Sequence, residues 1–246
     1  MDDVSELRRR EVETYFEVIA RGGTDRLLQA RSFHNLGEWT HQDYEWLCAV
    51  LSEANATSSF SFLGRDAERY AQTIAMLADA GHEIVLHGHR HVECETISYD
   101  LAHENVSRGL DAIDDAAGIV PEGFIAPRQA INGATLRVLD EFDFRWVLGR
   151  TDAEVSPSIK FAEPAHPYDL IILNEGANPT ETFAQLRTQS VTSQPLLFHP
   201  NMLEYYDALD DYRDWIHDVQ PVAITDYFDS DRTGLINDAM RPLRII

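Results

Sequence analysis

Short apolar runs alternate with amphipathic helical segments through most of this 246-residue chain. The runs are rich in β-branched and aromatic residues, and each is followed by a segment with helical periodicity. Strands separated by helices of about 10–15 residues are typical of βα units, whose strands pair in parallel within one sheet. We therefore expect an α/β fold, specifically a distorted parallel (β/α) barrel. The clearest strands are expected at Ala56–Leu63, Ile84–Leu86, Gly123–Ala126 and Phe144–Leu148, with helices at Asp43–Glu53, Asp66–Ala80, Asp100–Ala117 and Gly133–Phe142.

The same alternation extends to both ends of the chain. Further strands are expected at Leu27–Phe33, Leu170–Leu173, Pro195–His199 and Pro221–Thr225, and further helices at Pro179–Gln189 and Leu209–Asp218. No shift in composition and no Pro/Ser-rich linker divides the sequence, so residues 27–246 are predicted to form one catalytic domain. Residues 5–21 have the periodicity of a charged amphipathic helix. We expect residues 1–26 to supply an N-terminal helix packed on that domain.

The charge of the chain is strongly negative. Its formal net charge is −22, and Lys160 is the only lysine among 20 basic residues. Nucleic-acid binding needs clustered cations, so no nucleic-acid partner is expected. An acidic surface almost without lysine indicates a halophilic protein, because concentrated salt screens its self-repulsion. No apolar run approaches the roughly 18 residues of a membrane-spanning helix. The start of the chain lacks the basic and apolar regions of a signal peptide, so we expect a cytoplasmic protein.

Three histidines, His87, His89 and His91, follow the apolar run Ile84–Leu86 at alternate positions. Neutral imidazole is a common ligand of transition metals. His87 and His91 would share a face if the chain turned helical, whereas all three would share a face on a continuing strand. Either geometry presents two imidazoles to one ion, and an exposed polar turn is the alternative. His199 ends another strand-like run and could protonate a leaving group.

Several stretches of the sequence resemble the polysaccharide deacetylases, carbohydrate esterase family four. They are Ala56–Phe60, Gly64–Tyr70 and Ala78–Ile84, within a likeness that extends roughly from Leu27 to Phe228. The resemblance implies a metal-dependent enzyme on a distorted (β/α) barrel that removes N- or O-acetyl groups from polysaccharides. By this resemblance, His87 and His91 match the family's metal-binding pair and His199 its general acid. Leu197 and Phe198 would form an apolar wall beside the acetyl methyl group.

The chain departs from the family at the first motif. The family's Thr-Phe-Asp-Asp, which supplies a base and a metal ligand, aligns with Ser32–Asn35, so both carboxylates are absent. His34 could complete a three-histidine zinc site with an open position for water. Asn35 could instead ligate through its amide oxygen. Glu38 or His41 could then take the proton of the bound water.

A second departure lies at Ile125, which stands where the family has an arginine that holds the base. Arg128 paired with Asp152 could replace that arginine. The favoured interpretation is a zinc-dependent hydrolase acting on an acetylated amino sugar or glycan, with Trp39 as a candidate for stacking on the sugar. The alternatives are an inactive barrel that binds a glycan or a protein partner, and a related C–N hydrolase acting on a small amide.

Overall fold

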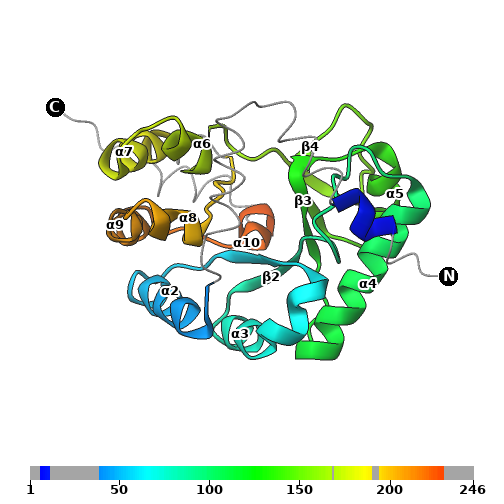
Figure 1. The fold of residues 1–246 in the computed structure, drawn as a ribbon, viewed down its shortest axis with the longest axis horizontal. Helices are drawn as coiled ribbons and strands as arrows, with labels where there is room; N and C mark the ends of the chain where they lie inside the picture. Colours follow the sequence, from blue (N-terminus) through cyan, green and yellow to red (C-terminus); the bar gives the residue numbers. More distant parts are fainter. Residues whose placement is uncertain (1–5, 12–38, 168, 190–193, 230–246) are drawn as a thin grey trace.

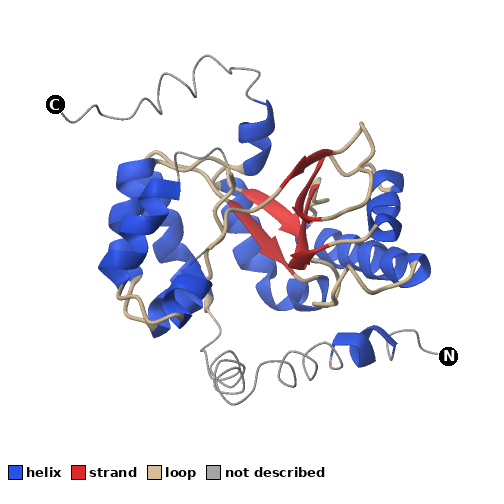
Figure 2. Ribbon diagram, turned by 90° about the horizontal axis from the view of Figure 1, so that it is seen from above, coloured by secondary structure: helices blue, strands red, loops and turns tan. Residues whose placement is uncertain are grey.

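The computed structural model describes residues 6–11, 39–167, 169–189 and 194–229, and its centre is a five-stranded parallel sheet (Figures 1 and 2). The strands are β1 (Ser59–Phe62), β2 (Glu83–Leu86), β3 (Gly123–Ala130), β4 (Trp146–Arg150) and β5 (Lys160–Ala162). They lie in the order β1-β2-β3-β4-β5, and every neighbouring pair is parallel. The expected α/β fold with a parallel sheet is thus confirmed.

Helices cover the sheet and form a second group beside it. The helices are α2 (His41–Glu53), α3 (Ala67–Asp79), α4 (Tyr99–Ala117), α5 (Gly133–Glu141), α6 (Asp169–Asn174), α7 (Pro179–Gln189), α8 (Pro200–Tyr205), α9 (Leu209–Val219) and α10 (Ile224–Asp229), with a 3-10 turn, η1, at Gly64–Asp66. In Figure 1, α6 to α9 lie on the left of the molecule, and the sheet with α4 and α5 lies on the right. A separate helical segment covers residues 6–11.

Local sequence explains where the helices of the sheet region begin and end. The Ser98 side chain accepts a hydrogen bond from Leu101 N at the start of α4, and Asn132 does the same for Thr135 N at the start of α5. Gly118 ends α4 in the left-handed conformation, with φ of 68°. These caps agree with the helix boundaries that the sequence predicted for this region.

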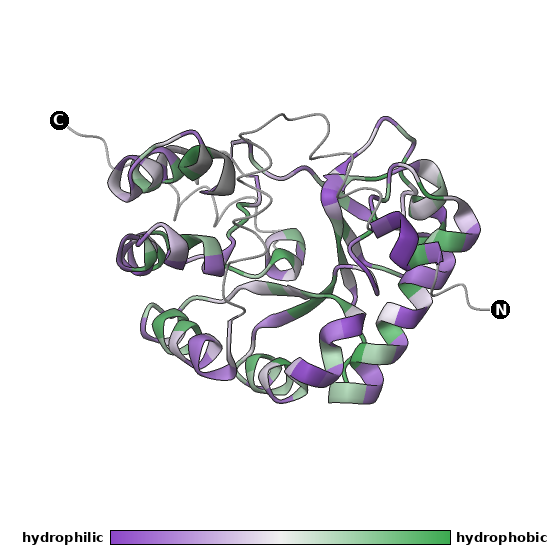
Figure 3. Ribbon diagram, in the orientation of Figure 1, coloured by the Kyte–Doolittle hydropathy of each residue, from purple (hydrophilic) through white to green (hydrophobic). Residues whose placement is uncertain are grey.

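Two main apolar clusters correspond to the two groups of helices. One joins the inner faces of α3, α4 and α5 to the sheet and contains Phe62, Ile74, Ile113 and Phe124. The other joins α2, α6, α7 and α9. Figure 3 shows that the central strands are mainly hydrophobic, whereas the outer faces of the helices carry polar residues. Among the described helices, none is long and apolar enough to cross a membrane.

Three strands expected in the second half of the chain are wrong. Leu170–Leu173 lies within helix α6, and Pro195–His199 is loop leading into α8. Of the third run, residues 221–223 are loop, and Ile224 and Thr225 begin α10. Runs of four or five apolar residues do not distinguish a strand from a buried helical turn. Prolines at both ends of the second run also remove donors that a sheet would need. The expected strand Leu27–Phe33 and the expected boundary between residues 26 and 27 lie outside the described residues.

Candidate metal centre and active site

The histidine pair lies in an irregular loop immediately after β2. His87 N donates to Phe62 O at 2.9 Å, and Gly64 N donates to Gly88 O at 2.9 Å, so the loop continues alongside the end of β1. Gly88 has φ of +83°, and a Cβ atom there would lie 2.6 Å from Asn105 Nδ2. Only glycine suits that combination of backbone and space. The chain therefore turns sharply after His87, in neither of the two regular geometries that the spacing allowed.

Asn105 on helix α4 holds the turn in place. Its buried side chain accepts from Arg90 N at 2.8 Å and donates to Arg90 O at 3.3 Å. Its backbone carbonyl accepts from His89 N at 2.9 Å. These bonds pair backbone polar groups of His89 and Arg90 that would otherwise lack partners inside the protein. The sequence did not single out Asn105, because a lone Asn in an amphipathic helix carries no motif.

The fold of the loop brings the imidazoles of His87 and His91 together, with ring centroids 4.9 Å apart. His87 Nδ1 donates to Ile125 O of β3 at 2.7 Å, so its Nε2 keeps a lone pair. Burial, followed by the neighbouring charge of His91, lowers the pKa of His87 to about 3. Burial, followed by the charges of Arg128 and Arg65, lowers the pKa of His91 to about 4. Both rings are therefore neutral near pH 7, the form in which histidine binds a metal.

Arg128 reaches this region through an irregularity in β3. The pairing of β3 with β4 shifts between Ile125 and Ala130, and Arg128 and Gln129 have left-handed φ values of 58° and 63°. Such a conformation is costly for two successive non-glycine residues, and it persists only where the surroundings hold it. The Arg150 guanidinium donates to the Gln129 side chain and to Pro164 O. The nearest acidic partner of Arg128 is Glu93, at 3.7 Å, in place of the expected Asp152.

His199 lies close to the same pair and is held by a buried carboxylate. Asp169, at the start of α6, is fully buried and accepts from His199 N at 2.6 Å. The His199 Nδ1 atom is 3.0 Å from the second oxygen of the same carboxylate. Burial alone would lower the pKa of His199, but the charge of Asp169 and its hydrogen bond outweigh it and raise the pKa. The charge of His199 in turn contributes to the lowered pKa values of His87 and His91.

Asp169 was missed by the sequence analysis because it stands 30 residues before its partner and in no motif. One signal was available: a single acidic residue directly precedes the apolar run Leu170–Leu173. A carboxylate that enters the core needs a specific partner. The ring of Phe198 packs on Tyr212 and Trp215 of α9, with centroids 4.8 Å away in each case. Phe198 is thus partly buried against the cluster of helices, and its role as a wall beside the acetyl group stays a prediction.

The other predicted site residues divide into those that the structure describes and those that it does not. His34, Asn35 and Glu38 lie outside the described residues. His41 is bonded to Thr73 Oγ1 at 2.9 Å, between α2 and α3. Within the part of the chain that is described, no three His, Cys, Asp or Glu side chains form a group that could hold a metal ion. His87 and His91 alone thus fit a metal through their chemistry and protonation.

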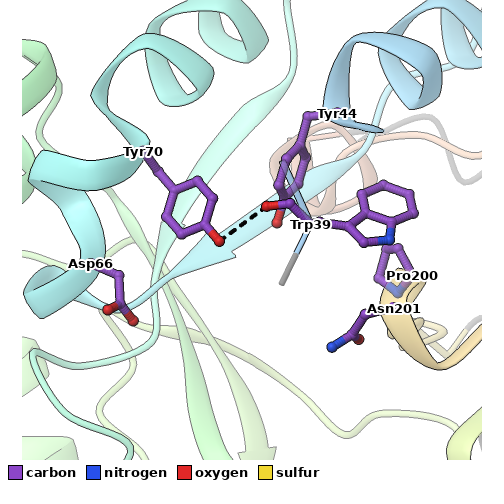
Figure 4. A pocket seen from close by; sticks show the side chains of 6 residues that line it. All are labelled: Trp39, Tyr44, Asp66, Tyr70, Pro200 and Asn201. Carbon is purple, nitrogen blue, oxygen red and sulfur yellow. Dashed lines mark hydrogen bonds between the residues drawn. The ribbon is translucent and has the colours of Figure 1, made fainter. Parts of the chain in front are cut away.

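A cavity of about 250 Å³ lies at the start of α8, the helix that follows His199 in the chain (Figure 4). It is lined by Trp39, Tyr44, Asp66, Tyr70, Pro200 and Asn201, the last two of which directly follow His199 in the chain. The Tyr70 hydroxyl donates to Trp39 O at 3.1 Å, and Trp39 Nε1 donates to Glu204 at 3.1 Å. These bonds fix the two aromatic rings at its rim. Aromatic rings combined with a few polar groups are typical of sites that bind small polar ligands.

Comparison with known proteins agrees with this geometry. Residues 35–147 match the family of polysaccharide deacetylases. A peptidoglycan deacetylase of Helicobacter pylori is 25% identical over 83 residues, which are 34% of this chain and 28% of that protein. The chain therefore matches little more than a quarter of that relative's length.

Solved structures show the same fold over a larger share of the chain. A putative polysaccharide deacetylase from Mycobacterium smegmatis has a TM-score of 0.67 and 22% identity, covering 90% of this chain and 84% of that one. A pseudoenzyme of carbohydrate esterase family four from Bacillus anthracis has a TM-score of 0.57 and 18% identity, covering 78% and 63%. A family 4 acetyl xylan esterase from Clostridium thermocellum, solved with a cobalt ion, has a TM-score of 0.56 and 17% identity, covering 73% and 80%. Residues 35–147 of this chain are thus similar to the polysaccharide deacetylase family, and the chain has the fold of these solved structures.

Proposed function

We propose that this chain is a metal-dependent hydrolase that removes N- or O-linked acetyl groups from a carbohydrate. The observation that carries the proposal is the convergence of two neutral histidines, His87 and His91, with a third, His199, that is made more basic by Asp169. Two groups with opposite protonation preferences, side by side, are what metal binding and proton donation require of histidine.

His87 and His91 would hold the metal ion, and we propose zinc, because two imidazoles suit it. A divalent cation bound there supplies polarisation of the acyl carbonyl and a water of lowered pKa. His34 or Asn35 is proposed as the third ligand and Glu38 as the base. The hydrogen bond from His87 Nδ1 to Ile125 O holds the ring and leaves Nε2 as the atom that would bind the metal.

His199 is proposed as the general acid. Asp169 accepts a hydrogen bond from Nδ1–H, which leaves the proton to be donated on Nε2 and keeps the ring charged to a higher pH. The departing amine or alcohol of the sugar would receive that proton as the bond between acyl carbon and leaving atom breaks. The cavity bounded by Trp39 and Asn201 is proposed to bind the sugar ring next to the acetyl group.

A non-catalytic binding barrel is the second candidate. Two observations favour it: Ile125 occupies the position of the family's arginine, and a structurally similar protein is described as a family four pseudoenzyme. The two candidates share the fold and the cavity. They differ in whether acetate is released.

The test combines metal content with turnover in one set of variants. Wild-type protein, His87→Ala, His199→Gln and the exposed-surface control His217→Ala are purified in high salt and assayed for bound zinc and for acetate release from N-acetylated amino-sugar oligomers. We expect about one ion per chain in all but His87→Ala. Acetate release should be lost in His87→Ala and His199→Gln and kept in His217→Ala. Bound metal without acetate release from the wild type would favour the binding barrel.

A further inference from the structure

A carboxylate from the N-terminal helical segment reaches the loop that carries the histidine pair. Glu11, the last residue of segment 6–11, forms an ion pair with Arg65 Nη1 at 2.5 Å and with Arg90 Nη1 at 3.2 Å. The same carboxylate accepts a hydrogen bond from the backbone N of His91 at 3.2 Å. Glu11 lies outside residues 35–147, the part of the chain that matches the family.

These contacts join two loops at the carboxyl end of the sheet. Arg65 belongs to η1, directly after β1, and Arg90 belongs to the loop after β2. The Glu11 and Arg90 side chains are only 18% and 17% exposed, so solvent screens their interaction less than on an open surface. Charge-assisted hydrogen bonds of this kind are about twice as strong as neutral ones.

The helical segment is itself anchored in the core. Leu7, one turn before Glu11, is fully buried among the residues of the cluster formed by the sheet with α3, α4 and α5. Positions i and i+4 share one face of a helix, so the burial of Leu7 directs Glu11 toward the same surface. Glu6, in the same segment, pairs instead with Arg9 and Arg10 of its own helix. The two glutamates of one short helix therefore have different partners, local for Glu6 and distant for Glu11.

We propose that Glu11 is a positioning residue for the metal site: it holds the backbone of His91 and offsets the charges of Arg65 and Arg90 beside it. Arg65 Nη1 and the backbone N of His91 contact the same oxygen of Glu11, at 2.5 and 3.2 Å. Without Glu11 the positive charges of Arg65 and Arg90 would be less compensated near His91, so a divalent cation would bind there more weakly. The inference rests on the proposed function, because it requires a cation at His87 and His91.

The test measures metal affinity directly, without relying on activity. Zn²⁺ affinity is determined by competition with a chromophoric chelator for the full chain and for Glu11→Gln, Glu6→Gln and the double variant Glu11→Gln/Arg65→Gln. Far-UV circular dichroism at the same temperature confirms that each is folded. Loss of a group that supports metal ligands typically weakens affinity by about 10- to 100-fold, so we expect at least a tenfold fall for Glu11→Gln. Glu6→Gln should stay within about twofold of wild type, since its ion pairs are local and exposed.

The double variant distinguishes an effect of the uncompensated Arg65 charge on metal affinity from a loosening of the N-terminal helix. Removing the Arg65 charge in the Glu11→Gln background should restore part of the lost affinity, a result that general loosening of the helix would not give. An affinity of folded Glu11→Gln within about twofold of wild type would overturn the inference while leaving the proposed function intact. A fall of the same size in Glu6→Gln would also overturn it. Failure of the wild type to bind Zn²⁺, with His87→Ala as reference, would overturn the proposed function and this inference together.

Discussion

Replacement of Asp169 by Asn separates the role of its charge from its role in packing. The amide has nearly the shape of the carboxylate, and its oxygen can still accept from His199 N, now 2.6 Å from the carboxylate. The substitution removes the full negative charge of the Asp169 carboxylate, which lies 3.0 Å from His199 Nδ1. The Asp169 side chain is 0% exposed. The pKa of His199, raised in the wild type, should therefore fall, because burial then acts without compensation.

The size of the effect follows from the same geometry. An adjacent opposite charge moves a pKa by about 1 to 3 pH units, and each unit corresponds to about 1.4 kcal/mol. The His199 side chain is 36% exposed, so solvent screening keeps the expected change near the lower end of that range. The alkaline limb of kcat against pH should move to lower pH by about 1 unit, so kcat on that limb should fall by up to about tenfold.

The assay is a pH profile of acetate release for wild type and Asp169→Asn, together with thermal melting. A raised folded-state pKa contributes stability that is complete below the unfolded value of 6.5 and is lost as pH rises through the folded pKa. Asp169→Asn should therefore be less stable than wild type at pH 5.5, and the difference should shrink toward alkaline pH. Zinc binding should be unchanged. An identical pH profile in the variant would refute the assignment of His199 as an acid tuned by Asp169.

Four further predictions concern stability and metal binding. The metal-free protein should lose stability in urea titrations as pH falls from 6.5 toward 4, because the unfolded chain gains a proton that folded His91 does not; His91→Gln should flatten this dependence. Glu83 accepts hydrogen bonds from Ser59, Trp146 and Thr225, so Glu83→Gln should lower the free energy of unfolding by about 2 kcal/mol, and an unchanged melting curve would contradict this network. Asn35→Asp should raise Zn²⁺ affinity by roughly tenfold in chelator competition, since a carboxylate is a stronger ligand than an amide; no gain would argue against a ligand role for this position. The melting temperature should rise from about 0.1 M to about 2 M KCl, and equal melting at both would refute adaptation to salt.

The first half of the fold could be predicted well because its local signals agree with one another. Strand β2 and helices α3 to α5 combine clear periodicity with capping residues such as Ser98 and Gly118. In the second half the runs at residues 170–173 and 195–199 are short, and their conformation is decided by tertiary packing against α7 and α9. The same distinction holds for the site. Spacing identified His87 and His91, whereas the pairing of Asp169 with His199 depends on how distant segments meet.

The sheet adds its strands in the order in which they occur along the chain, so each strand meets the previous one as soon as it is made. The proposed metal ligands, His87 and His91, follow β2 in this half, whereas Asp169 begins α6 and His199 directly precedes α8. Local opening of helices α6 to α9 alone would therefore separate proton donation from metal binding. Substitutions that loosen α6 to α9 should give a protein that still holds its ion yet turns over slowly. Loss of the proposed activity and loss of the proposed metal ion should thus be separable in this architecture.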